Sequence, residues 1–465
     1  MDEAARDRRL EPLDRVNGGL TDWPSGQAAY AYGAAFYQYL AERFGTEKLG
    51  ELAYRTARRV PYTASPVFSK VFGESLGDLW RDFEKAAESS TSVDGRSDAV
   101  RLTTSGFVTS GPRFEAKSCP DCGDGIVYTV RTPDAFPSLD RVTLAGGTTT
   151  TIAERYFGST TAVGRDVVYF DQVEIARNVA LTGDLYVWSR RTGDTTRITK
   201  GARLHDPDLS PDGARLTAVR EHDGQRDLVV VSKLSGHEPA IDVVAADSET
   251  QFNAPRWSPD GRSIAAERHR SGWDSELVLV DVESRAVRVA AGPAGARIVT
   301  PSWRPDGRAI LAAVATGDEP FNVYEFPTDG SATMRQLTAT AGGATWPEVS
   351  PDGHTLVYVG YSTAGFDLYS MPISETRPAV AIPPGEIVNQ SSQPQAASAV
   401  SGPVATGYSP RRTLLPTSCG CTSCRPIARG SATAPRPPSS TTRAACRWST
   451  GASTRGRSIR TTAWT

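Results

Sequence analysis

The phrase Pro207-Asp-Leu-Ser-Pro-Asp-Gly213 is written three more times along this chain with small changes. The other copies are Pro255-Arg-Trp-Ser-Pro-Asp-Gly261, Pro301-Ser-Trp-Arg-Pro-Asp-Gly307 and Pro347-Glu-Val-Ser-Pro-Asp-Gly353. The second proline of each copy lies 48, 46 and 46 residues from that of the next. A fixed period of this size, with one tight turn and several short strands per copy, is typical of a β-propeller with four-stranded blades.

Each copy holds the residues of a tight turn. Proline presets φ at the second position, aspartate tolerates the third, and glycine accepts a positive φ where the chain reverses. The turn residues expected to be structural are Pro211, Asp212, Gly213, Pro259, Asp260, Gly261, Pro305, Asp306, Gly307, Pro351, Asp352 and Gly353. The apolar anchors that flank them, expected to face neighbouring blades, are Leu209, Leu216, Trp257, Ile264, Trp303, Ile310, Val349 and Leu356.

An acidic residue followed by an alternating pattern marks the third strand of each blade. The candidates are Asp184–Val187, Asp227–Val230, Glu276–Leu279 and Asp367–Ser370. Two degenerate copies upstream, at 112–129 and 164–187, bring the predicted number of blades to six. Val100–Thr103 resembles the outer strand at Arg197–Thr199, so we expect it to complete the last blade and close the ring. Ala379–Ile382 is the rival for that edge.

The composition describes a soluble, turn-rich protein. The chain has 465 residues, a formal net charge of −2, 39% hydrophobic residues and 42 glycines. This balance predicts no nucleic-acid partner. No stretch approaches the roughly 18 to 20 apolar residues of a membrane span, and the N-terminus lacks the apolar core of a signal peptide. As written, the chain is therefore expected not to be exported and to stay cytoplasmic.

Residues 1–88 are predicted to form a small α-helical module. Helical spacing of apolar residues indicates helices at Gly26–Phe44 and Glu47–Val60, and a third at Leu76–Glu84 that Ser75 can cap. A Ser/Thr-rich run at 87–98 is interpreted as a linker. The predicted domains are thus 1–88, a propeller at 98–383, and a linker with a low-complexity, disordered tail at 384–465.

Two resemblances follow from these motifs. The repeated Pro-x-[Leu/Trp/Val]-[Ser/Arg]-Pro-Asp-Gly phrase with an acid-Leu third strand resembles the repeat of TolB-type six-bladed propellers over residues 98–383. The helical module, through Tyr30–Phe36, Tyr39–Gly45 and Val71–Trp80, looks like the C-terminal helices of a peptidase MA-type gluzincin metallopeptidase. The resemblance implies a periplasmic or cell-envelope protein, since such domains occur together in secreted bacterial proteins.

The chemistry of a gluzincin does not accompany the resemblance. A gluzincin binds zinc through His-Glu-x-x-His on one helix face, with the glutamate as general base. The five histidines of this chain all lie in the predicted propeller, and no two are four residues apart: they are His205, His222, His237, His269 and His354. We therefore predict no catalytic residue, no metal site and no cofactor, and interpret the module as a remnant.

The C-terminal stretch changes character after Tyr408–Pro416. From there the sequence is rich in Arg, Ser, Thr, Ala and Pro and contains no Asp, Glu or Lys, so it cannot bury a core. In related propeller proteins a similar stretch leads into an outer-membrane barrel, which suggests that the reading frame is lost near Thr417. A genuine basic tail that binds an anionic surface is the alternative.

Two further motifs have structural explanations. Gly73-Glu-Ser-Leu-Gly77 fits the nucleophile elbow G-x-S-x-G, but Ser75 is expected to cap a helix instead. Cys119-Pro-Asp-Cys122 stands where other copies carry a turn, and an extended turn with or without a disulfide is favoured over a redox pair or half of a zinc site.

The sequence favours a non-enzymatic binding scaffold. Equivalent positions at the starts of the inner strands should ring one mouth of the central channel, where a protein or peptide partner could bind. The candidate binding residues are His205, Asp206, Asn253, Thr300, Thr345 and Trp346. Trp346 is the predicted exposed aromatic anchor, whereas Trp257 and Trp303 are assigned to the core. The alternative is a fragment of a zinc metallopeptidase-propeller protein whose His-Glu-x-x-His region is missing upstream; a catalytic propeller is third.

Overall fold

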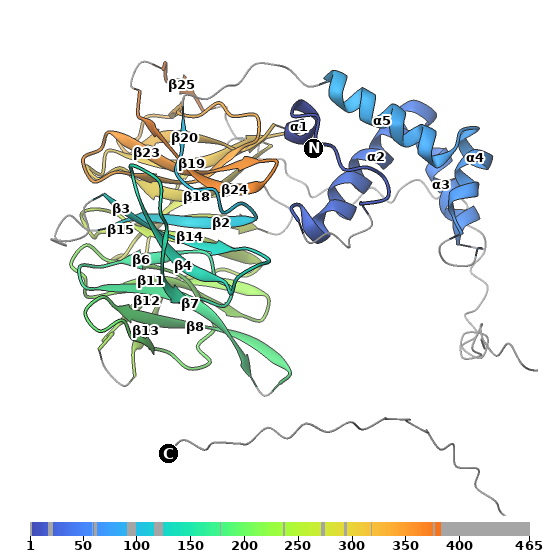
Figure 1. Ribbon diagram of the computed structural model, residues 1–465. Coiled ribbons are helices and arrows are strands. Elements are labelled where there is room, and N and C mark those ends of the chain that lie inside the picture. The colour runs from blue at the N-terminus through green and yellow to red at the C-terminus, as the bar shows by residue number, and fades with distance from the viewer. Residues whose placement is uncertain are drawn as a thin grey trace, which may run out of the picture. The chain divides into compact units, whose positions relative to one another are not determined.

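The computed structural model (Figure 1) describes most of the chain up to Ile382. The described residues are 2–16, 22–57, 59, 63–90, 99–115, 124–176, 178–235, 238–270, 275–292, 295–317, 319–374 and 377–382. Cys119, Cys122 and His237 lie outside these ranges, as does the predicted tail. Within them the protein is mainly β, with short helices in the N-terminal 90 residues.

The described strands form five sheets, in which the antiparallel pairings set out groups of four strands, as expected for propeller blades. The third and fourth groups belong to one eight-stranded sheet, because Arg226 and Gln251 pair in parallel between them. The first is β2 (Val108–Phe114), β3 (Gly125–Arg131), β4 (Ser138–Thr143) and β5 (Thr150–Glu154), and the second β6 (Thr161–Val163), β7 (Val167–Ala176), β8 (Ala180–Ser189) and β9 (Thr195–Arg197). The third is β10 (Leu204–Leu209), β11 (Leu216–His222), β12 (Gln225–Ser232) and β13 (Ala240–Ala245), and the fourth β14 (Thr250–Trp257), β15 (Ser263–Arg270), β16 (Glu276–Asp281) and β17 (Val287–Ala291). The fifth is β18 (Ala296–Trp303), β19 (Ala309–Thr316), β20 (Asn322–Pro327) and β21 (Thr333–Gln336), and the sixth β22 (Ala344–Val349), β23 (Thr355–Ser362), β24 (Gly365–Pro372) and β1 (Val100–Arg101).

The ring closes as the sequence predicts. β1 pairs with β24, with Val100 opposite Ser370, so the start of the β region completes the last blade. The rival segment forms β25 (Val380–Ala381) and pairs with β21, which adds a fifth strand to the preceding blade. Leu102, Tyr128 and Val359 share one hydrophobic cluster, which joins the first and last groups.

The repeated turn is held by the same bonds in three blades. In the first copy the Ser210 hydroxyl donates to the Asp212 carboxylate, which accepts the Ala214 amide at 3.0 Å. The Ser210 hydroxyl also accepts the Arg215 amide at 3.0 Å, and Gly213 has a φ of 71°. Ser258 with Asp260 and Ser350 with Asp352 repeat this arrangement. In these three turns the serine and aspartate side chains hold the reversal of the chain.

A buried acidic residue within the third strand binds the outer strand of the same blade. The buried Asp184 carboxylate accepts bonds from Arg197 at 2.7 Å, from Thr199 at 2.7 Å and from two backbone amides. Asp367 binds Arg101 and Thr103 in the same way across the closing edge of the ring. Each Arg-x-Thr segment of an outer strand therefore binds the acidic residue of the strand beside it.

The anchors that flank each turn form the hydrophobic contacts between blades. Those after the turns are at most 1% exposed: Leu216, Ile264, Ile310 and Leu356. Trp257 is 5% exposed, and Trp303 is partly buried and donates its indole N–H to the Arg256 carbonyl at 3.0 Å. Both tryptophans therefore have the core role predicted for them.

The N-terminal region is helical and has its own small core. Its helices are α1 (Asp2–Arg6), η1 (Ser25–Gln27), α2 (Ala28–Phe44), α3 (Thr46–Thr56), α4 (Ser65–Phe72) and α5 (Leu76–Ser90). Phe36, Phe68 and Trp80 pack together in this core. The Ser75 hydroxyl accepts the Asp78 amide at 3.1 Å, which confirms the predicted cap. In the described part of the chain, no helix has the length and apolar character needed to cross a bilayer.

Two features of this region differ from the prediction. α4 was not expected, because its apolar run from Val67 to Phe72 is short and follows Pro66. Pro66 lies in the first helical turn, where a missing amide donor is tolerated, so the helix forms. α5 runs to Ser90 and therefore enters the stretch interpreted as a linker.

Candidate functional site: a polar mouth above a closed axis

A β-bulge interrupts the inner strand of five blades at the same position. The pairing register shifts between the residues Ser110/Arg113, His205/Asp208, Asn253/Arg256, Val299/Ser302 and Thr345/Glu348. Each bulge contains a residue in the left-handed region, at φ between 44° and 56°: Gly111, Asp206, Ala254, Thr300 and Trp346. A bulge leaves backbone groups outside the strand ladder and redirects the neighbouring side chains.

The bulges bind one another from blade to blade. The Asp206 carboxylate accepts the Ala254 amide at 3.3 Å, and the Thr300 hydroxyl accepts the Trp346 amide at 3.0 Å. The Ser110 hydroxyl donates to the Ser159 carbonyl at 3.3 Å in the same manner. Because these bonds join neighbouring inner strands, the bulges surround one end of the axis. We call this end the mouth.

Four charged side chains meet on the axis directly after the bulges. Arg113 binds Asp208 at 2.9 Å and approaches Glu348 to 3.5 Å, and Arg256 binds Glu348 at 2.7 Å. These side chains are only 6% to 15% exposed. Both of the shorter pairs join residues two blades apart, so they must span the axis. We call these four residues the axial cluster.

The axial cluster closes the channel with paired charges. Burial raises the pKa of Asp208 to about 6, and the charge of Arg113 opposes that rise. Burial likewise raises the pKa of Glu348, while the charge of Arg113 and a hydrogen bond from Ser302 oppose it. Each buried carboxylate is therefore compensated by a guanidinium, as a buried charge requires.

His205 lies at the mouth between two carboxylates from different strands. Its Nδ1 is 3.5 Å from Asp171 of β7, and its Nε2 is 3.4 Å from Glu221 of β11. Burial alone would lower the pKa of His205, but Asp171 and Glu221 outweigh it and raise the pKa. The ring also covers Gly183 of β8, where a Cβ atom would come within 2.1 Å of it. Only glycine at that position leaves room for the histidine.

A fully buried arginine supports this histidine from below. Arg155 donates to the Asp171 carboxylate, to the Thr129 hydroxyl and to the Thr160 carbonyl. Burial would raise the pKa of Asp171, but the charge of Arg155 and the hydrogen bond from His205 outweigh it and lower the pKa. Asp171 is thus a fixed anion under the mouth.

More exposed polar groups continue around the mouth. Arg226 binds Glu221 at 2.6 Å and donates to the Asn253 amide oxygen at 2.6 Å. Glu267 bonds to His269 and accepts the Thr300 amide at 3.4 Å. Glu221 and Arg226 are 39% and 33% exposed, so they are reachable from solvent.

The structure places the six predicted binding residues in four inner strands. His205 and Asp206 lie at the start of β10, and Thr345 with Trp346 at the start of β22. Asn253 and Thr300 were expected at strand starts but lie in the middle of β14 and β18, because those strands begin at Thr250 and Ala296. The bulge bonds connect Asp206 to the fourth blade and Thr300 to Trp346, which brings these positions to one end of the propeller. Trp346 is partly buried and packs against the cluster that joins the first and last groups.

Sequence reasoning missed the axial cluster and the acids contributed by middle strands. A signal for the axial cluster was present, because Asp208, Arg256, Ser302 and Glu348 all occupy the second position of the repeated phrase. That position varies and is polar, on the register opposite to the buried anchors. Asp171 and Arg155 carry no such signal, because they lie in the degenerate second copy and the loop before it.

The described residues of the mouth form no metal cluster. Among them, no group of three or more His, Cys, Asp or Glu side chains is arranged to hold a metal ion. Ser75, which the elbow motif singled out, serves as a helix cap. What the mouth offers is hydrogen-bonding and charged groups of both signs, and these suit the recognition of a polar or charged partner.

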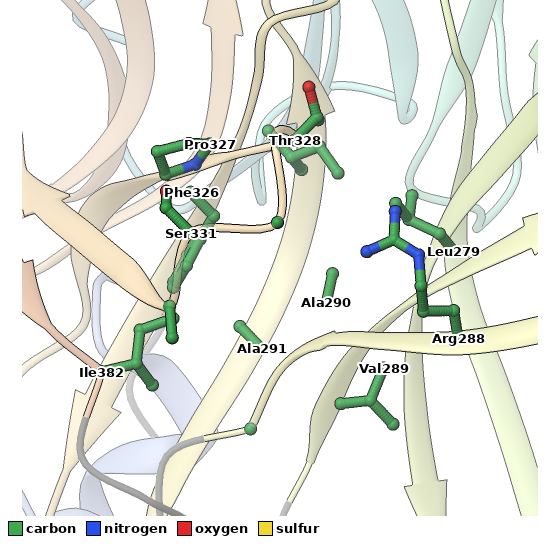
Figure 2. A pocket seen from close by; sticks show the side chains of 14 residues that line it. Leu279, Arg288, Val289, Ala290, Ala291, Phe326, Pro327, Thr328, Ser331 and Ile382 are labelled. Carbon is green, nitrogen blue, oxygen red and sulfur yellow. The ribbon is translucent and has the colours of Figure 1, made fainter.

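A second hollow lies away from the mouth, at the outer edge of the fourth and fifth blades. Figure 2 shows Phe326, Pro327 and Ile382 on one side of it and Val289 with Arg288 on the other. Its volume is about 350 Å³, and its lining is largely apolar. Arg288 is the charged residue of that lining, which therefore holds no acid-base pair.

Comparison with known proteins agrees with this architecture. Residues 241–396 match the family model of the TolB beta propeller domain. A search of curated proteins found no match to the sequence.

Similar solved structures belong to proteins with different names. TolB from Acinetobacter baumannii is 19% identical with a TM-score of 0.42, and the match covers 56% of this chain and 66% of that chain. Oligogalacturonate lyase from Vibrio parahaemolyticus is 13% identical with a TM-score of 0.42, covering 61% of this chain and 97% of that chain. A puromycin-hydrolyzing peptidase from Mycobacterium tuberculosis is 17% identical with a TM-score of 0.40, covering 56% of this chain and 45% of that chain. The strand pairing is that of a β-propeller, and residues 241–396 of the chain are similar to the TolB beta propeller domain.

Proposed function

We propose that this protein is a non-enzymatic scaffold, and that it binds a protein or peptide segment at the mouth. The observation that carries the proposal is the contrast among equivalent positions. The bulges share one backbone geometry, yet the residues at and beside them are as different as His205, Asn253 and Trp346. A binding surface needs this combination, because a backbone geometry that is the same in each blade then presents different side chains to a partner.

The closed axis supports binding from the mouth side. Arg113 with Asp208, and Arg256 with Glu348, connect blades that are two apart just behind the bulges. A segment that enters the mouth meets this charged floor and does not pass through. Its contacts are then made to the groups around the rim, among which Glu221 and Arg226 are the most accessible.

The test uses a defined pool of ligands. Phage-displayed random dodecapeptides are selected on the wild-type protein, and the selected pool is then applied to variants. We expect Glu221→Gln, Arg226→Gln and Trp346→Ala each to reduce recovery of the pool. Arg262→Gln and Arg308→Gln, exposed at the turn end, serve as matched controls and should leave recovery unchanged. Equal recovery on all variants would place binding elsewhere.

The proposed location and number of blades rest on the resemblance of the repeat to a known family. We propose a periplasmic or cell-envelope location and a six-bladed TolB-type ring, because the repeat resembles that family. The metallopeptidase alternative is tested by zinc analysis of the purified protein. A scaffold should carry zinc well below one ion per chain, whereas stoichiometric zinc that survives dialysis would favour the metallopeptidase interpretation.

A further inference from the structure

One hairpin rises beyond its blade at the mouth end. β7 and β8 are 10 residues long each, whereas the corresponding β15 and β16 are 8 and 6 residues long. In Figure 1 this green hairpin projects past the neighbouring strands. Its far part is apolar and exposed: Ile175 is 63%, Val179 87% and Leu181 65% exposed. Exposed aliphatic groups gathered at one place indicate an interaction surface.

The register shows which face of the hairpin carries these side chains. Asp171 pairs with Leu185, and four residues further along β7, Ile175 pairs with Leu181. Alternate residues of a strand share a face, so these four side chains point to the same side. Leu185 packs in the cluster of the third blade, which identifies that side. The apolar pair therefore continues the face that covers the third blade.

His205 marks the point where that face leaves the core. Its ring lies on Gly183, which is between Leu185 and Leu181 on the same face. Residues two apart in a strand are about 7 Å apart, so Leu181 stands about one such step beyond His205. The apolar pair thus forms a wall beside the polar groups of the mouth. We call Ile175 and Leu181 the hairpin wall.

The groups at the foot of the wall favour a cation. Asp171, Asp206, Glu221 and Glu267 contribute four carboxylates to the mouth. The cationic groups that face them are the guanidiniums of Arg155 and Arg226 and the imidazole of His205. Among the described residues, Asp206 takes part in no ion pair within 4 Å, and its carboxylate accepts the Ala254 amide. A carboxylate placed beside an apolar surface attracts a positively charged group that carries apolar neighbours.

We propose that the partner segment at the mouth is a peptide of alternating apolar and basic residues, with an apolar side chain on the hairpin wall and a basic one at Asp206. The inference rests on the proposed function and adds the chemistry of the partner to it. An extended peptide suits this arrangement, because its alternate side chains point to opposite faces and reach both surfaces at once.

The test uses three fluorescein-labelled decapeptides and fluorescence anisotropy. One alternates leucine and lysine, one leucine and glutamate, and one serine and lysine. We expect the leucine-lysine peptide to bind the wild-type protein at least roughly tenfold more tightly than either of the others, since each of those loses one of the two contacts.

The matched variants are pairs of exposed strand residues. Ile175→Thr with Leu181→Thr removes the hairpin wall and places β-branched residues, which suit a strand, at both positions. Val287→Thr with Val289→Thr makes the same change at exposed positions of β17, which are 41% and 46% exposed. We expect the first pair to weaken binding of the leucine-lysine peptide roughly tenfold and the second pair to leave it unchanged. Thermal melting should show that both pairs fold like the wild type.

The outcomes separate this inference from the proposed function. If Asp206→Asn weakens binding and the hairpin-wall variant does not, the peptide binds at the mouth without contacting the hairpin wall, and that part of the inference is wrong. Tighter binding of the leucine-glutamate peptide would overturn the charge assignment. If none of the peptides binds, the inference is wrong, while the phage selection still decides the proposed function. Loss of binding in the Val287/Val289 pair alone would move the site to β17.

Discussion

The two ends of each blade follow opposite rules. At the turn end, Ser210 with Asp212 and Ser258 with Asp260 make the same bonds to the same backbone atoms. At the mouth end, the backbone bulge is repeated, but the side chains on it differ from blade to blade. The comparison teaches that repetition of chemistry marks what holds the fold, whereas repetition of shape with changing chemistry marks what is free to recognise a partner.

The largest expected effect is at the buried charge beneath the mouth. Arg155→Met leaves the Asp171 carboxylate buried without its guanidinium, so the free energy of unfolding should fall by about 3 to 5 kcal/mol. Arg262→Met, an exposed arginine at the turn end, is the control and should change it by less than about 0.5 kcal/mol. Urea denaturation measures both. A loss below about 1 kcal/mol in the first variant would show that the mouth does not depend on this charge.

A smaller effect is expected where the ring closes. Asp367→Ala removes the acceptor for Arg101, Thr103 and the Gly106 amide, so stability should fall by about 2 to 3 kcal/mol. Asp184→Ala removes the equivalent acceptor within the second blade and is the matched control. If the ring is closed by β1, hydrogen exchange of the β24 amides should accelerate in the Asp367 variant and stay unchanged in the Asp184 variant.

The turn end offers a graded comparison among its own copies. Asp212→Ala deletes bonds to Ser210 and to the Ala214 amide and should cost about 1 kcal/mol of stability. Asp306→Ala should cost less, because Arg304 replaces the serine and binds Glu325 instead. Denaturant midpoints of the two variants decide this. An equal loss at both positions would mean that the serine bond adds nothing.

The smallest effect is a pH dependence of binding at the mouth. Burial and the charge of Asp171 raise the pKa of Asp206 to about 6, and the pKa of the adjacent His205 is also raised. The hydrogen bond from the Ala254 amide and the charge of Arg226 lower the pKa of Asp206 and so oppose that rise. As the pH falls from 7.5 to 5, Asp206 loses its negative charge and His205 gains a positive one. The leucine-lysine peptide should then bind about fivefold more weakly. Asp206→Asn should flatten this profile, and a profile unchanged by that substitution would rule Asp206 out.

The repeating half of the molecule was predictable from sequence, and much of the site was not. The prolines, the glycines and the anchor residues carry local signals for turns and buried strands, so the blades, the core tryptophans and the closing strand at Val100 were predicted correctly. The start of the inner strand at His205 followed from the same register, whereas the strand that holds Asn253 begins three residues earlier, at Thr250. The bulge that aims them could not be foreseen, since it depends on contacts between blades.

The charged residues behind the mouth show why the rest was missed. Arg113 contacts residues 95 and 235 positions away, and Arg155 is buried by strands of two blades. Sequence periodicity describes one blade at a time, so it says nothing of side chains that meet across the axis. The short α4 was missed for a different reason, because eight residues beginning next to a proline give too little helical periodicity.

The most direct test of the account is hydrogen-deuterium exchange of the protein with and without saturating leucine-lysine decapeptide. We expect the peptide to protect the backbone amides of residues 178–183 in the hairpin and 221–226 in the neighbouring loop from exchange. The amides of the turns at 210–214 and 258–262 should exchange as in the free protein. Protection at the turn end, or at the edge strand β17, with none at the mouth, would contradict it.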